Sequence, residues 1–324
     1  MPDARLLIPV GMKPSHVRAS RIDAPVRRLS GATMGTGWSL AFAAPDDVTN
    51  TAVVSALEET FALVIRQMSN WEPDSDLSRF NREEGWHDLK QDFFTVLSRA
   101  LEIAQLTNGA YDPTLGARMD MLGFGPPVQG SQPARKHGWR DIQLAPASRR
   151  AQQPGGAALD LSSIAKGHAV DLCAARLRAL GIPSFLMEIG GEFVGEGVKS
   201  DAQPWWVQLE LSDMPPAPDE PPQTDIALVN LAVATSGDFV RRREGISHLL
   251  DGRTGQPIRG DLSGVSVMHA SAMEADGWAT ALFALGAEQG LAMADAQGLA
   301  AVFATRTPEG SRSQFSAKAQ EMLG

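Results

Sequence analysis

The chain has 324 residues, of which 43% are hydrophobic and 21% are charged, a composition typical of a folded, water-soluble protein and unlike that of disordered or fibrous chains. Its formal net charge of −9 argues against an electrostatic interface with nucleic acid or with anionic membranes. The single cysteine, Cys173, excludes an internal disulfide and any zinc site built from several thiolates.

Residues 1–30 are predicted to form a loosely structured N-terminal arm. Its longest apolar run, residues 6–10, is too short for the core of a signal peptide. The sequence also contains no stretch of about 20 apolar residues, which a transmembrane helix requires. We therefore expect a cytoplasmic protein without a transmembrane segment, or a periplasmic one if an export signal is missing from this sequence.

The first elements after the arm are a strand and a long helix. Trp38, Leu40 and Phe42 alternate with small residues, which predicts a half-buried strand over 36–42. A helix is predicted from Asn50, taken as its N-cap, because apolar residues then recur at spacings of three and four. These apolar residues are Val54, Leu57, Phe61, Val64 and Met68.

Two more helices follow, each ended by a glycine. The second is predicted over 93–106 with Asn108-Gly109 as its stop, and the third from Ser162-Ser163 to Gly181. Strands are predicted at 185–189 and 205–211, followed by residues 212–225. That segment holds five prolines in 14 residues, so it should be a surface loop inserted between strands.

The C-terminal third is predicted to contain further strands, one long final helix at 273–285, and a polar tail. Helices separated by runs of strands favour an α+β arrangement over strict βαβ alternation. The expected division is an arm (1–30), one domain (31–305) carrying the inserted loop, and a tail (306–324). The additional strands are predicted at 226–235, 248–251 and 265–269.

Two loop segments carry residues suited to a binding site. Trp71 follows the first long helix and could offer a flat face to an aromatic ligand, although such a segment alone is more often a capped loop with a buried tryptophan. The segment 109–116 contains Tyr111, the only tyrosine, and Asp112, which precedes a proline. The backbone of Asp112 is thereby biased toward an extended conformation that can turn its carboxylate into a cleft, but a plain turn is an open alternative.

The start of the third predicted helix has the chemistry of an anion site. Asp160 is followed by Ser162, Ser163 and Lys166, and the N–H groups of a helix N-terminus carry partial positive charge. The spacing is not that of a Walker phosphate-binding loop. Lysine is slightly unfavourable in a first helical turn, which favours a functional role for Lys166.

The last predicted helix carries a candidate metal site. Asp276 and Thr280 are four residues apart and therefore share one helical face. A carboxylate and a hydroxyl in an otherwise apolar helix suit Mg²⁺, which takes few protein ligands and completes its shell with water and phosphate. The alternative is an exposed polar stripe.

His248 is the histidine whose flanks best suit catalysis, because a strand is predicted to enter a loop there. A lone histidine on a strand is more often structural, and that alternative stays open. The pair Gly190-Gly191 permits close approach of the backbone to a ligand but equally marks a bulge.

Taken together and in order, these segments resemble the ApbE flavin transferases from about residue 31 to residue 305. Each motif is weak alone, but their order is specific. The resemblance is carried by Met34-Gly35-Thr36, 74–81 (Asp-Ser-Asp-Leu-Ser-Arg-Phe-Asn), 111–114 (Tyr-Asp-Pro-Thr), 160–167 (Asp-Leu-Ser-Ser-Ile-Ala-Lys-Gly), Gly190-Gly191, 235–238 (Thr-Ser-Gly-Asp), 247–251 (Ser-His-Leu-Leu-Asp), and 275–277 (Ala-Asp-Gly) with Thr280.

The resemblance implies an α+β fold of antiparallel sheets flanked by helices, similar to paired T-fold units. It also implies an activity, in which FAD and Mg²⁺ are used to transfer FMN to a threonine or serine hydroxyl of an acceptor flavoprotein. The FMN is attached through a phosphoester bond and AMP is released. Two alternatives stay open: a Mg²⁺-dependent FAD pyrophosphatase giving FMN and AMP, and a non-catalytic FAD-binding protein.

The resemblance also assigns roles to single residues. Ser163, Asp276 and Thr280 match positions that hold the metal. We hypothesise that His248 or Asp251 deprotonates or orients the acceptor hydroxyl. The positions that match FAD contacts are Met34, Trp71, Ala110, Tyr111, Asp112, Asp160, Lys166 and Leu250.

Overall fold

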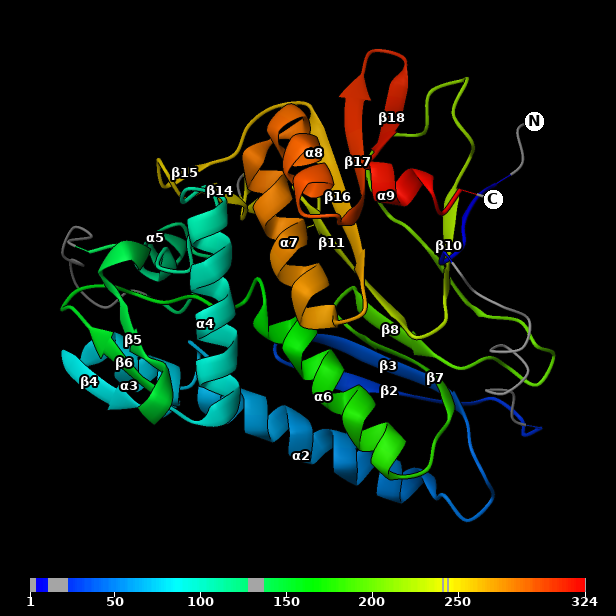
Figure 1. The fold of residues 1–324 in the computed structure, drawn as a ribbon, viewed down its shortest axis with the longest axis horizontal. Helices are drawn as coiled ribbons and strands as arrows, with labels where there is room; N and C mark the ends of the chain where they lie inside the picture. Colours follow the sequence, from blue (N-terminus) through cyan, green and yellow to red (C-terminus); the bar gives the residue numbers. More distant parts are fainter. Residues whose placement is uncertain (1–3, 11–22, 128–136, 241, 244, 324) are drawn as a thin grey trace.

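The centre of the fold is an eight-stranded sheet in which every neighbouring pair is antiparallel (Figure 1). The structure, a computed structural model, describes residues 4–10, 23–127, 137–240, 242–243 and 245–323. The strands of this sheet are β2 (Arg27–Thr33), β3 (Thr36–Ala43), β7 (Ser184–Ile189), β8 (Glu192–Glu196), β11 (Leu231–Gly237), β16 (Leu262–His269), β17 (Ala300–Thr307) and β18 (Gly310–Phe315). Their order across the sheet is β18-β17-β16-β11-β8-β7-β3-β2.

Helices cover one face of this sheet and form the larger hydrophobic core with it (Figure 1). Helix α7 packs on β11 and β16, while α6 packs on β7 and β8 and against α7 and α2. The helices on this side are α2 (Asn50–Met68), α3 (Asp76–Arg82), α4 (Gln91–Leu106), α5 (Gly116–Met121), α6 (Ala165–Ala179), α7 (Ala272–Leu285) and α8 (Ala287–Ala296). The short helix α9 (Ala317–Gln320) contributes Ala319 to the core on the opposite face.

The opposite face of the sheet is covered by a second core, which includes the three-stranded sheet β1-β10-β9. Strand β17 shows the division, because Ala301 and Phe303 join the first core while Val302 and Ala304 join the second. This is the two-residue periodicity of a strand that is buried on both faces. The strands of the smaller sheet are β1 (Arg5–Leu7), β9 (Trp205–Gln208) and β10 (Thr224–Leu228).

Short strands complete the fold at its periphery. One small sheet packs near α3 in the order β4-β6-β5 (Figure 1). Two hairpins lie in the segment between β11 and β16. These strands are β4 (Gly85–Asp88), β5 (Gln143–Ala145), β6 (Arg150–Gln153), β12 (Arg242–Arg243), β13 (Ile246–Ser247), β14 (Leu250–Asp251) and β15 (Gln256–Pro257).

The predicted α+β class of antiparallel sheets flanked by helices is confirmed. The first helix ends at Met68, the last apolar residue of the predicted pattern, but its N-cap is Thr49, whose hydroxyl accepts a hydrogen bond from Ala52 N at 3.2 Å. Gly109 and Gly181, predicted as helix stops, have φ angles of 81° and 75°, the left-handed conformation that suits glycine.

Several predicted elements were wrong in extent. The segment 226–235 is two strands, because the chain turns at Asn230 (φ 53°) and passes from β10 in one sheet to β11 in the other. The predicted strands 205–211 and 248–251 are too long, because only the residues of β9 and β14 form strands there. The helix at 273–285 is not the last, since α8 and α9 follow it.

The two chain ends are more regular than predicted. The arm contributes β1, which pairs in parallel with β10, and the start of β2. The tail contributes the end of β17 and all of β18 and α9. The division into arm, domain and tail stays a prediction. In the part of the chain that the structure describes, no helix is long and apolar enough to cross a membrane.

The proline-rich loop lies on the surface of β18. Residues 212–223 have neither helix nor strand, and β10 begins at Thr224. Ala217 N donates to Ser311 O at 3.0 Å, and Ser311 N donates to Pro215 O at 2.8 Å. These two bonds attach the loop to the edge of the large sheet.

Candidate active site

A cavity of about 450 Å³ lies between two hairpin turns of the large sheet, the loops that follow α4 and precede α6, and one side of α7. Its wall includes the β2–β3 turn at Met34-Gly35-Thr36, the β7–β8 turn at Gly190, and the end of β11 at Thr235–Gly237. The same wall contains Ala110 from the loop after α4, Asp160 from the segment before α6, and Lys166 from the first turn of α6. Motifs far apart in sequence therefore converge on one space.

The side of the cavity formed by the start of α6 is rich in polar groups. Asp160 Oδ1 accepts a hydrogen bond from Ser162 N at 2.8 Å, and the Ser163 hydroxyl donates to Tyr111 Oη at 3.0 Å. Tyr111 is only 3% exposed, and burial raises the pKa of its phenol, an effect that the Ser163 bond partly opposes. Tyr111 therefore stays protonated near neutral pH.

The carboxylate of Asp112 is held by hydrogen bonds within the turn that the sequence predicted. Its Oδ1 accepts from Thr114 N at 2.8 Å and from the Thr114 hydroxyl at 2.6 Å. The side chain is buried in the cavity wall. Ala110 O next to it accepts from Gly252 N at 2.9 Å, so the loop after β14 is tied to the Tyr111 segment.

Asp276 lies at a close crossing of α6 and α7. Its Oδ2 accepts from Gly167 N at 2.9 Å, and only 4% of the residue is exposed. Burial raises the pKa of Asp276, whereas the Lys166 ammonium and the Gly167 bond oppose that rise. One turn further along the same face, Thr280 Oγ1 lies 2.9 Å from Ser236 Oγ.

These residues form a set of oxygen donors suited to a hard cation. Ser163, Asp276 and Thr280 all line the cavity, and Mg²⁺ prefers oxygen ligands while retaining water and phosphate in its shell. Among the described residues, no three His, Cys, Asp or Glu side chains cluster closely enough to hold a metal. Two hydroxyls and one carboxylate are nevertheless ligand types that fit Mg²⁺.

Glu192 is a cavity residue that the sequence analysis missed. It is the first residue of β8, and its Oε1 forms an ion pair with Lys166 Nζ. The only sequence signal was its position directly after Gly190-Gly191. Met119, Val240 and Ala284 are further lining residues that no motif indicated.

His248 also reaches the cavity wall, together with Leu249 and Leu250. Its ring centroid lies 6.1 Å from that of Phe124. Asp251 is not among the lining residues, because its carboxylate turns to Arg253, with Arg253 Nε 2.9 Å from Oδ1 and Nη2 3.0 Å from Oδ2.

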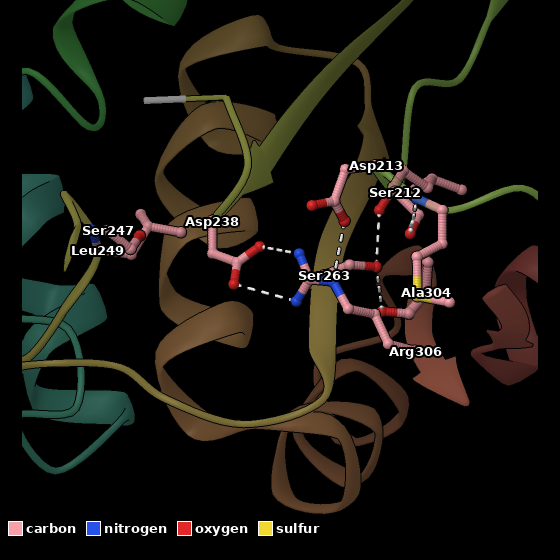
Figure 2. Close-up of polar contacts among 10 residues, drawn as sticks. Ser212, Asp213, Asp238, Ser247, Leu249, Ser263, Ala304 and Arg306 are labelled. Carbon is pink, nitrogen blue, oxygen red and sulfur yellow. Dashed lines mark hydrogen bonds and ion pairs between the residues drawn. The ribbon is translucent and has the colours of Figure 1, made fainter. Parts of the chain in front are cut away.

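The segment that leads from β11 to His248 is anchored at its start by Arg306 (Figure 2). The Arg306 guanidinium forms two hydrogen bonds with the Asp238 carboxylate, of which the Nη1–Oδ2 bond is 3.1 Å. Its Nε lies 2.8 Å from Asp213 Oδ1 in the proline-rich loop. Asp238 N also donates to Ser263 O at 3.1 Å. Arg306 thus connects the cavity segment, β17 and the inserted loop.

Trp71 is the second predicted residue that lies outside the cavity wall. It is 55% exposed, and its backbone N–H donates to Ser69 Oγ at 3.1 Å in the loop after α2. The buried tryptophan that the sequence left as an alternative is therefore wrong. All other predicted site residues line the cavity; the role of each stays a prediction.

The family of this chain follows from its similarity to known proteins. The model of the ApbE family matches residues 34–303. The chain belongs to the ApbE family. The resemblance seen in the sequence is thereby confirmed, over nearly the span that the motifs indicated.

Relatives of this ApbE member have a named activity. The chain is 31% identical to a protein of Haemophilus influenzae over 90% of both chains, and 31% identical to one of Vibrio cholerae over 91% of this chain and 92% of the relative. Both relatives are FAD:protein FMN transferases. The flavinyl transferase ApbE of Pseudomonas stutzeri has the same fold, with a TM-score of 0.82 and 31% identity over 93% of this chain and 98% of that one.

Proposed function

We propose that this chain is a Mg²⁺-dependent FAD:protein FMN transferase. It attaches FMN from FAD through a phosphoester bond to a threonine or serine hydroxyl of an acceptor flavoprotein and releases AMP. The observation that carries the proposal is the convergence of Ser163, Lys166, His248, Asp276 and Thr280 on one cavity. The relatives that share the family support the same activity.

The start of α6 is suited to the diphosphate of FAD. The N–H groups of Ala165 and Gly167 already donate to Leu161 O and Asp276 Oδ2. The attraction for an anion therefore comes from the helix dipole and from the positive charge of Lys166 in the first turn. Lys166 lies in the cavity wall beside Ser162 and Ser163.

Ser163, Asp276 and Thr280 would hold the Mg²⁺ ion. When bound, the ion supplies positive charge that stabilises the developing negative charge on phosphate oxygens. Asp276 is held for this role by Gly167 N–H and by the nearby Lys166 ammonium, which favour its ionised form despite burial.

His248 is the residue best placed to act on the acceptor hydroxyl. In the proposed reaction the hydroxyl oxygen attacks the phosphorus of the FMN part, and the phosphoanhydride bond to AMP breaks. The proton of the hydroxyl passes to a ring nitrogen of His248 as the phosphoester forms. Asp251 is less well placed, because its carboxylate is paired with Arg253 outside the cavity wall.

Release of AMP with and without an acceptor tests the proposal. The protein is incubated with FAD and Mg²⁺, with or without an acceptor domain that carries a threonine or serine flavinylation motif, and AMP is quantified by chromatography. A transferase releases AMP only when the acceptor is present, and D276A releases none. Equal AMP without acceptor would support a pyrophosphatase, and bound but intact FAD would support a binding protein.

A further inference from the structure

Glu192 occupies a position that the β7–β8 hairpin fixes tightly. Gly190 and Gly191 have φ angles of 62° and 98°, conformations that residues with a Cβ rarely adopt. The turn places Glu192 at the start of β8, in the wall of the cavity and only 4% exposed. A carboxylate is thus buried beside the proposed substrate.

The buried carboxylate is paired with the ammonium of the α6 first turn. Glu192 Oε1 contacts Lys166 Nζ, while Glu192 Oε2 is buried without a hydrogen-bond partner in the described structure. Burial raises the pKa of Glu192, and the Lys166 charge opposes that rise and favours the ionised carboxylate. The same ammonium also acts on Asp276. Lys166 therefore lies between two buried carboxylates.

As a contact that only joins α6 to β8, this pair would be energetically unfavourable. Lysine is disfavoured near a helix N-terminus. The Lys166 side chain is 28% exposed, whereas its partner Glu192 is buried, and removing such a carboxylate from water is costly even when it is paired. The other end of β8 contacts the same helix through an ion pair near the surface, where less charge is removed from water. There, Glu196 Oε1 lies 2.6 Å from Arg178 Nε. Joining α6 to β8 does not require the buried pair.

We propose that Glu192 is a positioning residue, which holds the Lys166 ammonium toward the diphosphate of the FAD substrate. This inference rests on the proposed function. A lysine side chain loses considerable rotamer entropy when it is fixed, and the contact with Glu192 imposes that loss before the substrate arrives. An ammonium group has three N–H donors, so one bond to Glu192 still allows bonds to phosphate oxygens.

A double-mutant cycle measures this role directly. FAD affinity is determined from the quenching of flavin fluorescence for the wild type, E192A, K166A and the double variant, with Mg²⁺ present throughout. We expect E192A to weaken FAD binding about tenfold, the size of one lost hydrogen bond to a charged group. In the K166A background, E192A should have no further effect, because its action passes through Lys166.

Two more variants separate positioning from folding. E192Q keeps an acceptor for Lys166 and should recover part of the affinity that E192A loses, with a KM effect that exceeds the kcat effect. E196A removes the matched surface pair with Arg178 and should leave FAD affinity unchanged. If E192A fails to fold, the same cycle is run with E192Q and E192D.

Three results would overturn the role of Glu192. These are an equal loss of affinity from E192A in both backgrounds, tighter FAD binding by E192A, or equal weakening by E196A. Failure of the proposed function looks different: the wild type would bind FAD but leave an acceptor unmodified, and the cycle could still be measured. A wild type that transfers FMN without coupling between the two residues would refute the positioning role alone.

Discussion

The crossing of α6 and α7 leaves no space for a side chain at Gly167, which makes G167A a sharp test of the site geometry. A Cβ there would lie 2.2 Å from Ala272 O and 2.8 Å from Asp276 Cβ. The carbonyl belongs to the α7 backbone and cannot rotate aside. Overpacking of this kind costs about 1–3 kcal/mol, and so close a backbone contact belongs at the upper end.

Alanine also has a better helix propensity than glycine by about 1 kcal/mol. The expected net effect of G167A is therefore a decrease of about 2 kcal/mol in the free energy of unfolding. Separation of the helices would also lengthen the bond from residue 167 N to Asp276 Oδ2, so we expect FMN transfer to be lost. Urea denaturation followed by circular dichroism measures the first effect, and the acceptor assay measures the second.

G277A is the matched control for the stability measurement. It lies inside α7 and gains the same propensity, but its Cβ would meet the terminal Cδ1 atoms of Ile103 at 2.9 Å and Ile164 at 3.1 Å. Flexible side-chain ends can move by a few tenths of an ångström, so G277A should change stability by less than about 1 kcal/mol. The reasoning is refuted if G167A is as stable and as active as the wild type, or if G277A is equally destabilised.

Three further predictions concern the metal, the histidine and the cysteine. Chelation of divalent cations should abolish FMN transfer, and added Mg²⁺ should restore it, because the cavity supplies oxygen ligands suited to this ion. H248A should lower the transfer rate about 100-fold or more, the usual value of a general base, while FAD still binds, as flavin fluorescence would show. Burial raises the pKa of Cys173 to about 12, so its thiol stays protonated and should react with a thiol reagent at pH 8 only after unfolding.

Each of these predictions has a result that contradicts it. Full FMN transfer in the presence of a chelator would show that the reaction requires no divalent cation. An H248A rate equal to that of the wild type would leave the acceptor hydroxyl without its proposed base. Labelling of Cys173 in the folded protein at the rate of the unfolded chain would show that the thiol is not buried in solution.

The fold was predictable where its patterns are local. Helix α2 buries Leu57, Phe61 and Val64 on one face, and this spacing is visible in the sequence. Strand β17 was missed because it is buried on both faces and reads as a short apolar run, which a strand and a helix segment share. The turn at Asn230 was missed because nothing local shows that β10 and β11 belong to different sheets.

The site was predictable as a set of segments rather than as a geometry. The order of the motifs placed Tyr111, Ser163 and Asp276 in one group, and the structure brings them to one cavity. Glu192 escaped because its importance comes from Lys166, 26 residues away in sequence. Asp251 was named with His248 as a candidate to act on the acceptor hydroxyl, but its carboxylate pairs with Arg253 and is not part of the cavity wall.

The central claim is tested most directly by the intact mass of an acceptor domain after incubation with this protein, FAD and Mg²⁺. The account predicts a mass increase equal to one FMN phosphoester, located on a threonine or serine by fragmentation and absent with D276A. An acceptor of unchanged mass, in a reaction where an established FAD:protein FMN transferase modifies it, would contradict the account.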